Sequence, residues 1–166
     1  MKTIDELKND KGELDHNAIK QVIPYEIPFL MFDKVLELKK DKIVAIKHVS
    51  ANDPNLNGHF RGFPIMPGAL IIEGMGQAGT LLVRYNLENH WEKEVLAYKI
   101  KDAKFKEPIF PGQTLKYEIA LMGLEDRGGM LTAVASVDGK NVAECQMMLA
   151  VVDRKEFRAK HSKAYN

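Results

Sequence analysis

The stretch from Gly62 to Val83 most limits how this chain can fold, because it contains a single charged residue, Glu73. Two prolines within its first six residues prevent a continuous helix before position 67. Proline suits the first helical position, where its missing N–H would be unpaired anyway, so a helix is predicted over 67–85. From residue 68 to residue 83 this helix would be about 24 Å long, shorter than the roughly 30 Å hydrocarbon core of a bilayer.

Glycines at positions 74, 76 and 79 follow Glu73 within the same helix. A lone carboxylate and three helix-weakening glycines suit lipid poorly, so we expect a helix buried on nearly all sides in a soluble domain. Close packing against a sheet or a partner helix explains the glycines best, and the alternative is close approach of a bound ligand.

Six strand-like runs accompany the helix, at 29–38, 42–49, 95–105, 114–124, 130–137 and 141–152. Gly128-Gly129 and Asp138-Gly139 are hairpin signals, so antiparallel pairing is expected. A short helix is predicted over 17–23, capped by Asp15 and ended by Pro24. One sheet can cover only one side of a helix that is apolar all round. A second copy of the chain is the simplest cover for the other side, which predicts an α+β dimer.

The chain has 166 residues, a net charge of +1 and one cysteine. We expect an extension over 1–14 that packs loosely, one domain over 15–153 and a basic tail over 154–166. The near-neutral charge gives no reason to expect nucleic-acid or membrane partners. The first ten residues are polar, unlike a signal peptide, and one cysteine cannot form an internal disulfide. A cytoplasmic location is therefore expected.

Glu73 is the first candidate for chemistry, because an ionised carboxylate in apolar surroundings is costly unless it is paired. A salt bridge or an exposed position would explain it without any function. The functional alternative is a carboxyl group with a perturbed pKa inside a cavity. Gln77 lies four residues later on the same helix face and can hydrogen-bond it.

His59 is the second candidate, within Asn57-Gly58-His59-Phe60-Arg61-Gly62. A loop histidine is most often a surface residue, but the glycines allow a tight turn and Phe60 suggests that the loop folds inward. A neutral imidazole in an apolar pocket can act as a base near pH 7. The helix start at Gly68 offers unpaired N–H groups that can polarise a carbonyl. Together these groups suit proton removal next to a carbonyl, followed by β-elimination.

The 3-hydroxyacyl-[acyl-carrier-protein] dehydratases, the FabZ/FabA-type enzymes, have an active-site segment that resembles GHFRGFPIMPGALIIEGMGQAG. The chain is also similar to them, in order and spacing, at IPYEIPFLMFDKVLEL and KFKEPIFPGQTLKYE. The resemblance covers roughly residues 19–153, and Glu73 follows His59 by the 14 positions that the family requires. A glutamate at this position resembles the FabZ type, whereas the FabA type usually has aspartate.

The resemblance implies a hotdog fold, in which a bent antiparallel sheet wraps a long central helix and two subunits share a continuous sheet. It implies dehydration of (3R)-3-hydroxyacyl-acyl-carrier-protein to trans-2-enoyl-acyl-carrier-protein in fatty acid or related acyl-chain biosynthesis. His59 would remove the C2 proton, Glu73 of the other subunit would protonate the leaving hydroxyl, and the Gly68 N–H would hold the thioester carbonyl. No metal or organic cofactor is implied. The implied partners are acyl carrier protein and further copies of the chain, in a homodimer or in a hexamer built as a trimer of dimers.

The acyl chain would need an apolar tunnel. Each candidate residue for the lining of this tunnel could equally well be an ordinary residue of the hydrophobic core. The candidates are Phe29, Leu30, Met31, Phe63, Ile65, Met66, Tyr98, Ile100 and Phe110. The carrier protein is acidic, so a basic rim would help docking, although charged runs are usually only solvated faces. The candidates for this rim are Lys99, Lys101, Lys104, Lys106, Arg154, Lys155 and Arg158.

The chain departs from the resembled family at Arg61, where proline is common, and at Tyr25-Glu26, where His-Arg is common. These departures leave open a pathway other than housekeeping fatty acid synthesis. Two other functions also stay open: a hotdog acyl thioesterase, and a non-catalytic subunit of this fold that binds acyl carrier or lipid.

Overall fold

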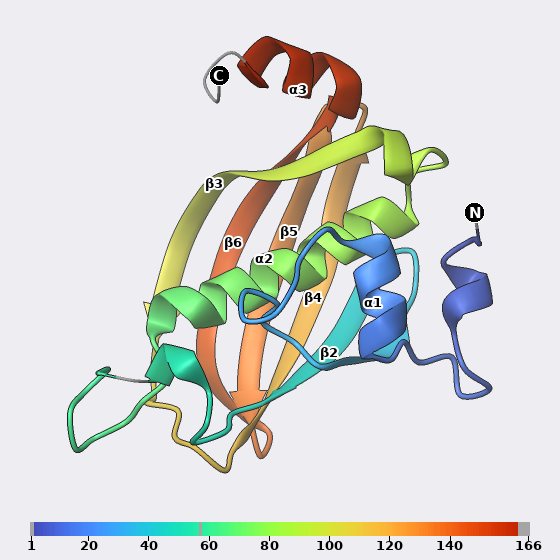
Figure 1. Cartoon of the computed structure of the whole chain (residues 1–166). Coiled ribbons are helices and arrows are strands. Elements are labelled where there is room, and N and C mark those ends of the chain that lie inside the picture. The colour runs from blue at the N-terminus through green and yellow to red at the C-terminus, as the bar shows by residue number, and fades with distance from the viewer. Residues whose placement is uncertain (1, 57, 163–166) are drawn as a thin grey trace.

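A six-stranded antiparallel sheet curves around one long helix (Figure 1). The structure is a computed structural model that describes residues 2–56 and 58–162. The strands lie in the order β1-β2-β4-β5-β6-β3. Their bounds are β1 Lys34–Leu38, β2 Lys42–His48, β3 Lys93–Phe105, β4 Thr114–Glu125, β5 Gly128–Val137 and β6 Lys140–Asp153. The architecture is the bent sheet and central helix expected from the sequence.

The central helix is α2 (Gly68–Tyr85), which begins one residue after the predicted start, with Pro67 at its N-cap. Alternate residues of the sheet face it: Leu131 and Leu149 are buried and lie within contact distance of the position where a side chain on Gly79 would stand. This close approach of sheet and helix explains that glycine. Within the described ranges, no helix is both long and apolar enough to cross a bilayer.

The N-terminal segment packs onto the domain, so the expectation of a loose extension over 1–14 was wrong. Ile4, just before a short 3-10 turn, η1 (Asp5–Leu7), is buried at 5% exposure, and Leu14, after the turn, is buried at 0% exposure. Leu14 and Val35 exchange two backbone hydrogen bonds, of 3.0 and 2.9 Å, which extend the sheet by one bridge. The following helix, α1 (His16–Val22), is capped by the Asp15 side chain, as predicted.

Two other elements differ from expectation. The strand expected from residue 29 begins only at Lys34, because part of the preceding backbone bonds to a helix side chain instead of a neighbouring strand. The basic tail contains a helix, α3 (Arg154–His161), which the Asp153 carboxylate caps by accepting from the backbone N–H groups of Lys155 and Glu156. Two further 3-10 turns, η2 (Pro54–Leu56) and η3 (His90–Glu92), precede α2 and β3.

Candidate active site

Glu73 lies half-buried in the N-terminal half of α2 and is held by Gln77 one turn later. Gln77 is 1% exposed, and its Nε2 donates to Glu73 Oε1 at 2.9 Å and to the Phe29 carbonyl at 2.7 Å. Its Oε1 accepts from the Met31 N–H at 2.8 Å. One amide therefore fixes the carboxyl group of Glu73 relative to the segment before β1.

Tyr25 occupies the position where the resembled family commonly has histidine. Burial raises the pKa of the Tyr25 phenol, and the negative charge of Glu73 raises it further. Its ring packs edge-on against Phe29, with 5.6 Å between ring centroids. A phenol with a raised pKa stays neutral at neutral pH, so this departure from the family places an uncharged hydroxyl near the carboxylate.

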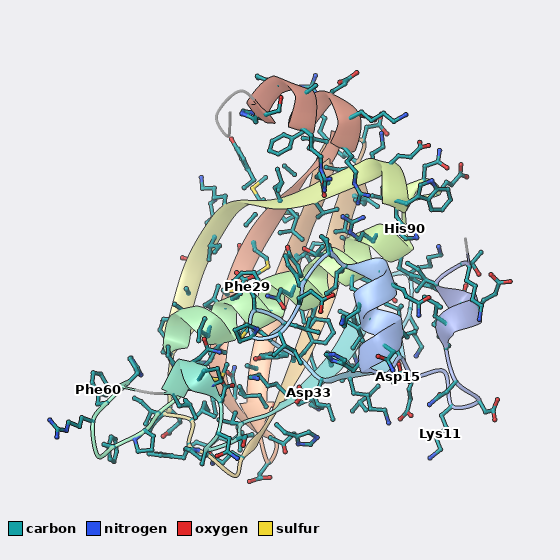
Figure 2. The ribbon with its side chains drawn as sticks, in the orientation of Figure 1. Lys11, Asp15, Phe29, Asp33, Phe60 and His90 are labelled. Atoms are coloured by element: carbon teal, nitrogen blue, oxygen red, sulfur yellow. The ribbon has the colours of Figure 1, made fainter. Side chains whose placement is uncertain are left out.

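His59 is held by a tight loop between Gly58 and Gly62, whose φ angles of 88° and 76° favour glycine. His59 Nδ1 lies 3.0 Å from the carbonyl oxygen of Ile65, and the Ile65 N–H donates to the His59 carbonyl at 2.9 Å. A carbonyl oxygen can only accept, so Nδ1 carries the proton of the neutral ring and Nε2 keeps a free lone pair. The Phe60 ring stacks on the imidazole at 4.3 Å, on the loop that projects beyond the start of α2 (Figure 2).

His59 and Gly68 line the same cavity, which has a volume of about 460 Å³. A side chain on Gly68 would stand 2.8 Å from the Phe105 ring, so only glycine leaves room for this ring at the helix start. The N–H groups of Gly68 and Ala69, the first two residues of α2, have no intrahelical acceptors, whereas the Leu70 N–H donates to the Pro67 carbonyl at 2.9 Å. An imidazole and backbone donors therefore open onto one cavity, whose other lining residues are Ile65, Met66, Ala69, Ile71, Phe105, Lys106, Glu107, Pro108 and Ile109.

Glu73 is not among the residues that line this cavity. One chain therefore brings His59 and Gly68 together but leaves Glu73 and Gln77 outside. This placement agrees with a site in which the acid comes from another subunit, as the resemblance implies.

The predicted tunnel residues are scattered among several environments. Ile65 and Met66 border the cavity with His59. Leu30 and Met31 are buried in the core, and Phe110 is half-buried against the ring of Phe63 at 5.4 Å. Four others are exposed and within one chain line no common tunnel with the rest: Phe29, Phe63, Tyr98 and Ile100.

A buried ionic cluster at the other end of α2 was missed by the sequence reasoning. Arg84 is 1% exposed; its Nη2 lies 3.7 Å from Glu94 Oε2 and donates to the Lys93 carbonyl at 3.1 Å. Burial lowers the pKa of the neighbouring His90, and the charges of Arg84 and Arg154 lower it further. An arginine in the last turn of a helix ordinarily indicates an exposed C-terminal cation, so the sequence carried no signal of this burial.

Comparison with known proteins places the chain in a family. Residues 23–146 match the model of the FabA-like domain. A 3-hydroxyacyl-[acyl-carrier-protein] dehydratase FabZ from Solibacter usitatus is 38% identical over 143 residues, covering 86% of this chain and 88% of the relative. A dehydratase of the same name from Clostridium botulinum is 41% identical over 141 residues, covering 83% of this chain and 96% of the relative.

Solved structures with low identity show the fold alone. The dehydratase heterocomplex ApeI:P from Xenorhabdus doucetiae contains a chain that superposes with a TM-score of 0.73 at 16% identity, covering 84% of this chain and 93% of that one. A hypothetical thioesterase with coenzyme A from Streptococcus pneumoniae superposes with a TM-score of 0.58 at 11% identity, covering 72% and 84%. The predicted hotdog fold and the predicted dehydratase resemblance are confirmed. The chain belongs to the FabA-like family, and its similar relatives within that family are FabZ dehydratases.

Proposed function

We propose that this protein converts (3R)-3-hydroxyacyl-acyl-carrier-protein to trans-2-enoyl-acyl-carrier-protein and water in acyl-chain biosynthesis. The observation that carries the proposal is the cavity shared by His59 and the N-terminus of α2. Relatives of 38% and 41% identity that bear the FabZ dehydratase name support the same reaction. FabZ is also part of the name of a bifunctional LpxC/FabZ protein from Chlorobaculum tepidum, of which this chain covers 30%.

The residues of the site would divide the elimination among three roles. The thioester carbonyl accepts from the Gly68 N–H, which stabilises the negative charge that develops as C2 loses its proton. His59 Nε2 takes that proton, because its lone pair is free while Nδ1 is held by a carbonyl. The C2–H electron pair forms the C2=C3 double bond as the C3–O bond breaks. Glu73 gives its proton to the departing hydroxyl, which leaves as water.

Glu73 would reach this reaction from a second subunit. Strand β3 lies at one edge of the sheet and is exposed from Leu96 to Phe105. A long unpaired edge is a template for pairing with another strand. Antiparallel pairing of two β3 strands would make a homodimer with a continuous sheet, and the partner subunit's Glu73 would face the cavity that contains His59.

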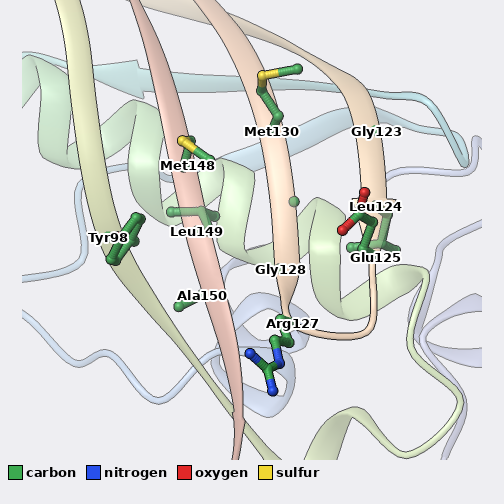
Figure 3. Close-up of a pocket in the computed structure, with 11 residues that line it drawn as sticks. Tyr98, Gly123, Leu124, Glu125, Arg127, Gly128, Met130, Met148, Leu149 and Ala150 are labelled. Atoms are coloured by element: carbon green, nitrogen blue, oxygen red, sulfur yellow. The ribbon is translucent and has the colours of Figure 1, made fainter.

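A second interface could join such dimers into a hexamer. Figure 3 shows Tyr98, Met130 and Met148 projecting from the face of the sheet that points away from α2, where they line a hollow of about 650 Å³. Their exposures are 73%, 49% and 39%. Apolar patches on an exposed sheet face commonly mark interaction sites, which favours the trimer of dimers over the free dimer.

No step of this reaction needs a metal or an organic cofactor, and acyl carrier protein would present the substrate. Burial raises the pKa of the Cys145 thiol to about 11, so this cysteine stays protonated in the core and takes no part in the chemistry. A single buried thiol is consistent with the cytoplasmic location that we propose.

The reaction is tested by incubating the protein with 3-hydroxyacyl carrier-protein thioesters and with small thioester mimics of several chain lengths. Formation of enoyl thioester and its loss by about 10²–10⁴-fold in His59→Ala are the expected results. His48→Ala is the control, because this exposed histidine lies outside the cavity and should leave the rate unchanged. Release of free acid would show a thioesterase instead, and binding without turnover would show a non-catalytic subunit.

The shared site is tested by mixing two inactive variants. His59→Ala and Glu73→Gln homodimers should each be inactive, since every site lacks its base or its acid. Mixed dimers contain one site with both groups intact, so equal mixing should restore about a quarter of the wild-type sites. Failure to restore activity, in a mixture shown by mass to contain mixed dimers, would contradict a site built from two subunits.

A further inference from the structure

Helix α3 is an exposed, positively charged element that adds little to the core. None of its residues, Arg154–His161, is buried. It carries four arginine and lysine side chains and one carboxylate, Glu156. Among the described residues, no carboxylate lies within ion-pair distance of Lys155 or Lys160, and both are exposed. The helix also lies beyond residues 23–146, the part of the chain that matches the family model. Burial of apolar surface therefore does not explain its position.

A buried anchor nevertheless holds α3 in one place. Glu94 Oε1 accepts from Arg158 Nε at 2.9 Å and lies 3.2 Å from Arg154 Nε, while its Oε2 lies 3.7 Å from Arg84 on α2. The Glu94 side chain is 11% exposed. Three guanidinium groups around one carboxylate leave an excess of positive charge. The Asp153 cap fixes the first turn of the helix, so the exposed Lys155 and Lys160 are carried by a helix that is held in place.

The position of α3 matters because of the strand beside it. Asp153, the last residue of β6, pairs with Lys93, the first residue of the edge strand β3, and Figure 1 shows α3 at this end of the sheet. Antiparallel pairing of two β3 strands about their centre at Lys99 would set Lys93 opposite the partner subunit's Phe105. Phe105 borders the cavity that contains His59. Arg154 would then lie about 10 Å, two strand spacings, from the edge of the partner's cavity.

We propose that α3 is the docking surface for the acidic acyl carrier protein, and that it serves the active site of the partner subunit rather than that of its own chain. This inference rests on the proposed function and on its β3-paired dimer. The carrier must remain outside while its thioester enters the cavity, so an acidic face of the carrier needs a cationic surface beside the entrance. The exposed ammonium groups of Lys155 and Lys160 supply that surface, and charge complementarity of this kind raises the rate of encounter.

The first experiment separates docking from chemistry. A Lys155→Glu/Lys160→Glu variant is assayed with a 3-hydroxyacyl carrier-protein thioester and with a small 3-hydroxyacyl thioester that has no carrier. The expected result is a fall in kcat/KM of about tenfold with the carrier substrate, mostly through KM, and no change with the small thioester. Lys2→Glu/Lys11→Glu is the matched control, because it reverses two exposed charges on the N-terminal segment, where Figure 2 shows Lys11 at the opposite end of the molecule from α3. The control should behave as wild type with both substrates.

The second experiment tests which subunit α3 serves, by using mixed dimers with one working cavity. When one subunit carries His59→Ala and the other carries the two α3 changes, the working cavity is flanked by an intact α3. Turnover of the carrier substrate per working cavity should then equal that of a mixed dimer between wild type and His59→Ala. When one subunit carries all three changes and the other is wild type, the working cavity is flanked by the changed α3. Its kcat/KM should then fall about tenfold.

The outcomes distinguish the docking surface from the function on which it rests. If wild type dehydrates neither substrate, the proposed function fails. If wild type dehydrates both and the α3 variant loses activity equally with both substrates, or with neither, the docking proposal is overturned. Binding of α3 to vesicles of anionic phospholipid, without an effect on the carrier substrate, would assign the helix to a membrane surface instead. A reversed result in the mixed dimers would assign α3 to the cavity of its own chain.

Discussion

Gln77 Nε2 donates to Glu73 Oε1 at 2.9 Å, and the same amide group bonds the backbone of Phe29 and Met31. The proposed acid is therefore positioned by a residue that also holds the chain segment leading into β1. Any change at Gln77 should affect both the orientation of the carboxyl group and the attachment of that segment to α2.

Replacing Gln77 with leucine keeps the side-chain volume but removes these hydrogen bonds. The Met31 N–H and the Phe29 carbonyl would lose their partner, and leaving buried polar groups unpaired costs about 1–3 kcal/mol each. We expect the free energy of unfolding to fall by about 2–4 kcal/mol, and kcat to fall more than KM changes, because Glu73 loses its fixed orientation. Urea denaturation and steady-state kinetics measure the two effects.

Gln21→Leu is the control for this substitution. Gln21 is exposed on α1, and its amide bonds only the carbonyl of Asn17 one turn earlier. Its loss should change stability by less than about 0.5 kcal/mol. If Gln77→Leu were as mild as Gln21→Leu, the amide would not be holding Glu73 or the segment before β1.

The same hydrogen bonds show why part of the fold could not be predicted. The apolar run that begins at residue 29 has the composition of a strand, and a strand was therefore predicted there. A glutamine 46 positions from Met31 takes up its backbone N–H, so that end of the run does not join the sheet. Nothing local in the sequence shows such a partner. The helix over 67–85 was predicted to within one residue, because its signals, a proline start and a continuous apolar pattern, are local.

A dependence of stability on pH is expected from His90. Burial lowers the folded-state pKa of His90 below 6.5, and the neighbouring arginine charges lower it further. The unfolded chain therefore binds this proton at a higher pH than the folded chain does. The stabilisation is fully present above pH 6.5 and is lost as the pH falls toward the folded-state pKa. Urea denaturation between pH about 7.5 and about 5 should show the decline.

His90→Asn should flatten this part of the profile, whereas His48→Asn, at an exposed site, should leave it parallel to wild type. Glu144 does not interfere, because its ion pair with Lys106 lowers its pKa, and the stability that this gives is lost only below the ordinary glutamate value of 4.5. Equal slopes for wild type and His90→Asn would show that another group carries the dependence.

The residues of the candidate site that belong to short sequence motifs could be predicted. Features that depend on contacts between residues far apart in the sequence, or on different subunits, could not. The sequence placed His59 and Gly68 in segments that the structure brings onto one cavity. That Glu73 would act from another subunit came only from the family resemblance, because the residues of one sequence do not say which copy supplies a group to a site. The helical tail was missed although Asp153 and Glu156 have capping-box spacing, a local signal that could have been read.

The glycines that follow Glu73 were expected to serve packing, and two of the three do so. A side chain on Gly74 would meet the Tyr117 hydroxyl at 2.6 Å, and one on Gly79 would meet Leu131 at the same distance. At Gly76 the nearest atom is the Met147 sulfur at 4.0 Å. The three glycines look equivalent in the sequence. Only the sheet residues that face them show that two positions are closely packed and the third is not.

This difference predicts opposite effects of the same substitution two residues apart. Alanine favours helix over glycine by about 1 kcal/mol, so Gly76→Ala should stabilise the protein by up to that amount. Gly74→Ala should destabilise it by about 1–3 kcal/mol, because the Tyr117 ring is fully buried and cannot move aside.

Among the described residues the Tyr117 hydroxyl has no hydrogen-bond partner, so Tyr117→Phe alone should be nearly neutral. In the Gly74→Ala background it should recover more than about 0.5 kcal/mol, a coupling that a double-mutant cycle measures. Similar effects of alanine at both glycines would mean that Tyr117 does not set the distance between β4 and α2.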